Sequence, residues 1–153
     1  MLTDAFLAGL HHITVFLFAS LLIVEVAIVY LPLSAPTLRF LSRIDGALGI
    51  VTLVVGPVGV SRLIWGAIPA DFYLYNAFFW AKMTFLSVLS FFTFVPGIRI
   101  QRWHKASVAD PSYVVSAGDI TYVRRALWAE VAMIVPVPIC AALMARGFGA
   151  FTL

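Results

Sequence analysis

The chain has 153 residues, of which 63% are hydrophobic and only 11% charged, with a formal net charge of +3. About a quarter of the residues in a soluble domain are charged, so this composition excludes an ordinary soluble enzyme and indicates an integral membrane protein. The chain contains four apolar runs, each of about 20 residues or more, long enough to cross a bilayer. We therefore expect one domain over residues 1–153, an all-α bundle of four transmembrane helices.

The first run predicts a helix at about 4–31. Because it is too long for a signal-peptide core and follows Asp4 rather than lysines, we expect it to be retained in the protein. Pro32 and Pro36, which lack a backbone donor, should end it.

The second helix is expected at about 44–65. Ser42 and Asp45 match the pattern of a capping box, in which side chains satisfy free backbone donors, so we interpret Asp45 as a cap. Three glycines, Gly49, Gly56 and Gly59, thin the surface of this helix, where a neighbour or a second copy of the chain can approach closely.

The third helix is predicted at about 76–95, with Asn76 as its cap and Pro96 after its end. The fourth is predicted at about 120–145, bent by Pro136 and Pro138. The segment between them, about 97–119, is interpreted as a polar cytoplasmic loop whose basic residues reflect membrane topology rather than nucleic-acid binding.

The positive charges are distributed unequally over the loops. Only Arg146 lies beside a span on one side, whereas seven basic residues lie on the other: Arg39, Arg43, Arg99, Arg102, Lys105, Arg124 and Arg125. Basic loops stay in the cytoplasm. Both termini are therefore predicted on the non-cytoplasmic side.

A short list of polar residues remains inside the spans: His11, His12, Glu25, Arg62, Lys82 and Glu130. A charge at the bilayer centre costs about 2.5 to 3.5 kcal/mol on insertion scales, so such residues suggest a functional site. Their depths indicate two layers.

The outer layer contains His11, Arg62 and Lys82, which helix geometry places roughly 5 to 9 Å below the outer helix ends. Trp65 and Trp80 are expected near the same interface. Lys82 and Arg62 have stems long enough to reach the headgroups by themselves, which is the simpler interpretation of each residue taken alone.

The inner layer contains Glu25 and Glu130, and helical spacing puts His11 and Glu25 on one face of the first helix. These acids are expected either to be neutral or to pair with arginines at the helix ends. His11 and His12 point about 100° apart, so one of them at most faces a given ligand.

A neutral imidazole in an apolar bundle is a common haem ligand. His11 could bind the iron of haem b while Arg62 and Lys82 hold its propionates, with His12, Trp65 and Trp80 as further candidate contacts. No second histidine lies at this depth, since His104 belongs to the cytoplasmic loop. The sequence has no glycine-rich phosphate loop, Cys/His metal spacing or Ser-His-Asp signature.

Three stretches carry a resemblance to a known family: His11-His12 with Glu25 on the first helix, RLIWG at 62–66, and FYLYN at 72–76 leading into FWAK at 79–82. Over about residues 5 to 145 the chain resembles a family of small four-helix bacterial inner-membrane proteins. That family is distantly similar to HemJ, the membrane protoporphyrinogen IX oxidase. The resemblance implies a bacterial inner-membrane location and a haem b site that needs a first-helix histidine and a third-helix lysine, here His11 or His12 and Lys82.

Three functions remain open. The first is a redox or porphyrin-binding protein in which His11 and Lys82 act at the cofactor, Glu25 and Glu130 carry protons, and a quinone takes the electrons. The second is a non-enzymatic partner or assembly subunit whose polar residues hold the bundle together. The third is a small proton-coupled anion transporter, for which four spans are few unless the chain forms a homo-oligomer.

Overall fold

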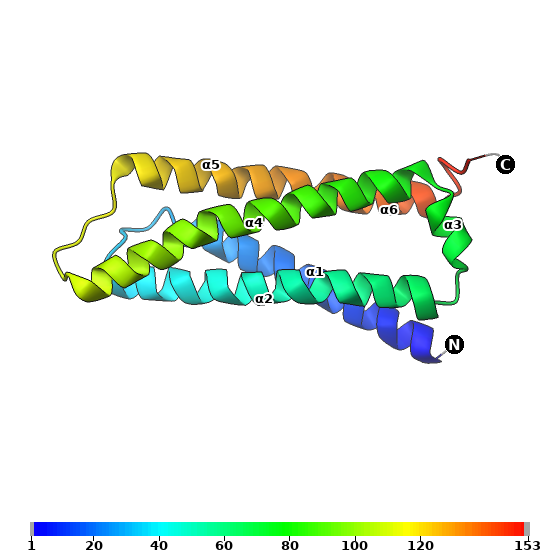
Figure 1. Ribbon diagram of the computed structural model, residues 1–153, viewed down its shortest axis with the longest axis horizontal. Helices are drawn as coiled ribbons and strands as arrows, with labels where there is room; N and C mark the ends of the chain where they lie inside the picture. The colour runs from blue at the N-terminus through cyan, green and yellow to red at the C-terminus, as the bar shows by residue number, and fades with distance from the viewer. Residues whose placement is uncertain (1, 152–153) are drawn as a thin grey trace.

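A computed structural model describes residues 2–151. Four helices in this part of the chain are long and apolar enough to cross a membrane, which confirms the predicted class of fold. Figure 1 shows an elongated bundle with both chain ends at one pole. We call this pole the terminal end, and the pole that carries the connections at 29–34 and 110–116 the loop end.

The helices follow one another in the order α1 (Leu2–Ile28), α2 (Ala35–Trp65), α3 (Ala70–Leu74), α4 (Ala77–Ala109), α5 (Ala117–Ile134) and α6 (Pro136–Ala145). α2 packs between α1 and α4, and α5 packs against α4 and α1, so the four long elements close into a ring. α5 and α6 together form the fourth span, from Ala117 to Ala145. The two are separated at Val135, which lies just before Pro136 and keeps helical backbone angles, and Figure 1 shows them as one nearly continuous span.

α2 begins nine residues earlier than predicted, at Ala35 instead of about residue 44. Pro36 lies in its first turn, where a missing backbone donor has no effect because the first amides of a helix lack partners in any case. The proline that was expected to end the first helix therefore starts the second. Asp45 consequently lies inside α2, and the capping role expected for it is wrong.

α4 continues through Pro96 to Ala109, so most of the polar loop predicted at 97–119 is helix, and the actual connection covers 110–116. Its last turns bury Ile100, Trp103 and Ser107 against the bundle. This spacing of three and four residues is that of one helical face. Packing against α2 thus carries the helix past a proline that, by itself, removes one backbone hydrogen bond.

Asn76 caps α4 as expected and also holds the C-terminal tail. Its side-chain oxygen accepts a hydrogen bond from the backbone amide of Phe78 (2.9 Å), and its side-chain nitrogen donates to the carbonyl of Phe148 (2.9 Å). Backbone bonds from Ala77 to Gly149 (2.8 Å) and from Phe151 to Tyr75 (2.9 Å) complete the attachment. The start of α4 and the end of the chain therefore form one unit.

The hydrophobic core lies toward the loop end. Its buried members come from the second half of α1, the first half of α2, the middle and second half of α4, and α5, and include Leu22, Leu48, Ile100 and Leu127. The terminal end has few fully buried side chains. His11, Arg62 and Lys82 are accordingly only partly buried, whereas Asn76 is fully buried.

Candidate functional site

The terminal polar layer, as we name His11, Arg62 and Lys82, is formed by three helices. His11 comes from α1, Arg62 from the last turn of α2 and Lys82 from the second turn of α4. Arg62 and Lys82 are both close enough to act electrostatically on His11, and Arg62 also acts on Lys82. The three residues predicted to share one depth are therefore brought together.

The imidazole of His11 packs against Gly59 of α2. A β-carbon at position 59 would lie 3.8 Å from Cε1 and 4.0 Å from Nδ1 of the ring. The glycine thus permits the close approach of α1 and α2 that was expected from the sequence. Nδ1 is buried and has no hydrogen-bond partner, and the same holds for Nε of Arg62. The layer therefore has unused hydrogen-bonding capacity.

Lys82 lies among aromatic residues without an acidic partner among the described ion pairs. Its ammonium nitrogen is 5.4 Å from the centre of the Phe79 ring, which is buried at the start of α4. An ammonium is attracted to the face of an aromatic ring. The aromatic setting accordingly offers Lys82 a weak electrostatic partner and leaves its charge available to a ligand.

The remaining candidates for cofactor contact lie outside this layer. His12 is exposed, and its Nδ1 is 2.7 Å from the carbonyl oxygen of Ala8 in its own helix. The side chains of Trp65 and Trp80 are 63% and 53% exposed, and Trp80 donates its indole hydrogen to the carbonyl of Leu74 (2.9 Å). Of the two histidines, His11 is the one that the structure joins to Arg62 and Lys82.

A second group, the buried carboxyl cluster, contains Glu25 of α1, Asp45 of α2 and Glu130 of α5. Their exposed fractions are 1%, 8% and 0%. Asp45 acts electrostatically on both glutamates, and Glu130 acts on Glu25. Both carboxyl oxygens of Glu25 and one of Glu130 are buried without a hydrogen-bond partner. The two predicted acids thus lie within electrostatic range of each other and of Asp45, which was expected only as a cap.

The arginines near the helix ends have other partners in the described part of the chain. Arg124 donates to the carbonyl of Val29 at the end of α1 (3.0 Å), and Arg99 forms an ion pair with Asp119. Neither neutralises Glu25 or Glu130. Of the two alternatives for these acids, the pairing with helix-end arginines is absent.

α4 supplies the polar partners of the cluster. The hydroxyl of Thr93 donates to Glu130 (3.1 Å), and the amide nitrogen of Gln101 donates to Asp45 (2.5 Å) and to the carbonyl of Ser42 (2.9 Å). Gly97, one turn from each of these two residues, leaves the space that the Asp45 carboxylate occupies.

These partners could have been found in the sequence. Thr93, Gly97 and Gln101 are spaced four residues apart, which places them on one helical face. The pattern was hidden because Pro96 was assumed to end the helix. Asp45 was interpreted as a cap because the second helix was expected to begin at about residue 44 rather than at Ala35.

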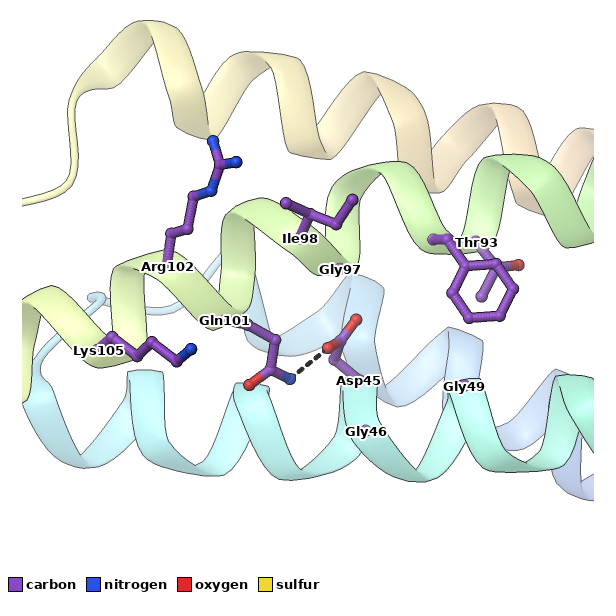
Figure 2. Close-up of a pocket in the computed structure, with 10 residues that line it drawn as sticks. Asp45, Gly46, Gly49, Thr93, Gly97, Ile98, Gln101, Arg102 and Lys105 are labelled. Carbon is purple, nitrogen blue, oxygen red and sulfur yellow. Dashed lines mark hydrogen bonds between the residues drawn. The ribbon is translucent and has the colours of Figure 1, made fainter.

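A groove of about 440 Å³ separates α2 and α4 beside this cluster. Figure 2 shows Asp45 and Gln101 facing each other across it, with Lys105 farther toward the loop end and Thr93 at the opposite limit. Gly46, Gly49 and Gly97 thin its walls. A smaller cavity of about 290 Å³ is lined by Arg39 and His104 at the loop end. Neither cavity is lined by His11 or Lys82.

Fold and site together define the class of this molecule, an all-helical integral membrane protein with four spans, a cationic layer at one end and a carboxyl cluster nearer the other. The chain belongs to the family of predicted membrane proteins DUF2214, whose model matches residues 3–149. No match to the chain was found among curated proteins or among solved structures.

Proposed function

We propose that this membrane protein binds an anionic tetrapyrrole, haem b or a porphyrin, at the terminal polar layer and uses it in a redox reaction within the membrane. The observation that carries the proposal is the convergence of an imidazole and two cations from three separate helices. Snorkelling of Arg62 and Lys82 to the headgroups would not require them to meet His11.

The residues of the layer fit the carboxylates of such a ligand. Arg62 offers hydrogen bonds in a planar fork that suits a carboxylate, and Lys82 adds a mobile positive charge. Buried Nδ1 of His11 faces Gly59, so a ligand would reach the imidazole at Nε2. Haem b, when bound, supplies one-electron redox chemistry.

The set of possible iron ligands is small. Within residues 2–151 no three His, Cys, Asp or Glu side chains come together as a metal site. His12 is exposed on α1 and His104 lies at the far end of the bundle, so His11 would be the one histidine at the iron. This arrangement suits a haem held by one imidazole, or a porphyrin without iron.

The distant resemblance to HemJ seen in the sequence is in keeping with this proposal, because His11 or His12 and Lys82 are the positions that match the histidine and lysine that HemJ needs. No curated protein matches the chain. Glu25 and Glu130 would carry protons and a membrane quinone would accept electrons. We place the protein in a bacterial inner membrane with the terminal end on the non-cytoplasmic side, on the basis of its basic residues at the loop end.

The test is an absorption spectrum of the detergent-purified protein, oxidised and reduced, followed by titration with haem and with protoporphyrin. We expect a Soret band, and binding weakened about tenfold or more by His11→Ala or Lys82→Met, since a hydrogen bond to a charged group contributes about 1.5 to 3 kcal/mol. Lys105→Met, which removes an exposed cation from the loop end, is the matched control. Absence of a Soret band together with absence of porphyrin binding would end the proposal.

A second candidate is proton-coupled transport of an organic anion. It is favoured by the vertical arrangement, in which a cationic layer that could capture the anion lies nearer one end and a carboxyl cluster that could exchange protons lies nearer the other. Proteoliposomes loaded with a carboxylate and a pH-sensitive dye would report coupled flux. Flux that Lys82→Met leaves unchanged would exclude this function for the layer.

A further inference from the structure

The groove between α2 and α4 connects the loop end with the buried carboxyl cluster. Its lining runs along α4 from Lys105 and Arg102 to Thr93, a span of about 18 Å on a helix. Its volume of about 440 Å³ exceeds the roughly 30 Å³ that a water molecule occupies in the liquid many times. Asp45, Gln101 and Thr93 provide the polar contacts that ordered water needs.

Thr93 joins the groove to the cluster. Its hydroxyl lies 3.1 Å from an oxygen of Glu130 and 3.0 Å from the carbonyl of Leu89. A hydroxyl has one hydrogen to donate and can accept two further hydrogen bonds. Thr93 can therefore donate to Glu130 while it accepts a hydrogen bond from the groove.

Among residues 2–151, the carboxyls beyond Thr93 form no ion pair with a cation. Glu130 has Thr93 of α4 and Asp45 of α2 beside it, and Glu25 has Asp45 and Glu130. An ionised carboxylate buried without a partner costs several kcal/mol, so the protonated form of both glutamates is favoured. Asp45 differs from them because it lines the groove and accepts a hydrogen bond from the amide of Gln101.

We propose that the groove is the route by which protons enter the cluster from the loop end, and that Asp45 is their first acceptor. A hydronium ion in the groove gives its proton to the Asp45 carboxylate and becomes water. When Glu25 has given its proton to a water molecule on the terminal side, it takes the proton of Glu130. Thr93 then passes its hydroxyl hydrogen to the Glu130 carboxylate and takes one from Asp45 through groove water. One O–H bond forms for each that breaks, and no electrons move.

This route deepens the proposed function and rests on it for the role of Glu25 and Glu130 as proton carriers, but its test needs no bound tetrapyrrole. The protein is reconstituted in lipid vesicles, and the infrared carbonyl bands of protonated carboxyls are assigned with Glu25→Gln and Glu130→Gln. Transfer into D₂O then gives the rate at which each band shifts. We expect Asp45→Asn to slow this exchange about tenfold or more, as for loss of a proton-transfer group, and Asp45→Glu to restore it.

A matched pair of leucine variants tests the groove without touching the carboxyls. A β-carbon at Gly46 or at Gly56 meets nothing within 4 Å, but only Gly46 lines the groove. We expect Gly46→Leu to slow the exchange and Gly56→Leu to leave it as in the wild type. If Asp45→Asn proves unstable, this pair of variants by itself tests whether protons pass through the groove.

Three results would overturn the route. The first is the absence of protonated carboxyl bands from Glu25 and Glu130. The second is an exchange rate in Asp45→Asn equal to that of the wild type. The third is a wild-type exchange rate in Gly46→Leu, which is expected if a lipid acyl chain rather than water fills the groove. Failure of tetrapyrrole binding with these exchange effects present would remove the proposed cofactor and leave the proton route standing.

Discussion

The carboxylate of Asp45 on α2 occupies the place of a missing side chain at Gly97 on α4. A β-carbon at position 97 would lie 2.5 Å from an oxygen of Asp45, closer than such atoms approach in real structures. The absence of a side chain at position 97 thus leaves the room that the Asp45 carboxylate fills.

We therefore expect Gly97→Ala to destabilise the protein by about 1 to 3 kcal/mol, the range for overpacking an interior site. Gly46→Ala is the control, because its β-carbon meets open space and alanine is favoured over glycine inside a helix by roughly 0.5 to 1 kcal/mol. Thermal unfolding in detergent compares the two. Equal melting temperatures would mean that Asp45 does not pack against Gly97.

Asn76 provides a second prediction, since one side chain both caps α4 and binds the tail at Phe148. Asn76→Ala should lower the free energy of unfolding by about 1 to 3 kcal/mol, from loss of the cap and of one further hydrogen bond. Asn76→Asp keeps the capping oxygen but loses the donor to Phe148. We expect this variant to retain most of its stability while the backbone amide hydrogen of Phe151 exchanges faster with solvent. An unchanged exchange rate would mean that the hydrogen bond from Asn76 to Phe148 does not hold the tail.

Glu130 should tolerate replacement by a side chain of similar shape that cannot ionise. It has no basic partner, so Glu130→Gln is expected to change the free energy of unfolding by less than about 1 kcal/mol, whereas breaking a buried ion pair costs about 3 to 5 kcal/mol. Glu130→Ala removes the buried side chain and should cost about 2 to 5 kcal/mol by leaving a cavity. Melting curves of the two variants give the comparison. A large loss of stability in Glu130→Gln would mean that Glu130 is ionised and paired with a cation.

Asp110 gives a pH-dependent prediction in the connection between α4 and α5. The hydroxyl of Ser112 (2.7 Å) and its backbone amide (2.8 Å) both donate to this carboxylate and lower its pKa below the usual value. A lowered folded-state pKa means that the contribution to stability is complete above the unfolded pKa, about 3.9, and is lost as the pH falls through the folded pKa.

Ser112→Ala should therefore reduce the melting temperature slightly at neutral pH, and the difference from the wild type should shrink on acidification. Because Asp110 is fully exposed, we expect the effect to be small. A difference that grows toward low pH would contradict the sign. The carbon chemical shift of the Asp110 carboxyl, followed against pH, measures the pKa directly.

The four spans and the two polar layers were predictable because hydrophobic run length and helical rise determine which residues share a depth. His11, Arg62 and Lys82 illustrate this, since each could be placed by counting residues from its helix end. Asn76 was equally readable as a cap from its residue type and position.

The bounds of α2 and α4 were not predictable in the same way. Pro36 and Pro96 suggest helix ends when taken locally, yet the first lies in a first turn and the second is held in a helix by packing on both sides. The roles of Asp45 and Gln101 depend on those bounds. These roles could not be predicted because contacts between two helices depend on how the helices pack. The local sequence around Pro36 or Pro96 does not contain that information.

The lengths of α2 and α4 have a consequence for what the protein presents outside the bilayer. With 31 and 33 residues, these helices measure roughly 46 and 50 Å, whereas the hydrocarbon layer is about 30 Å thick. Because a bilayer with its headgroups is about 40 to 45 Å thick, the two helices together are long enough to reach the membrane surface at the loop end, where Arg39 and Lys105 lie. The paired ends of these two helices thus give an antibody fragment or a soluble factor a rigid surface to bind.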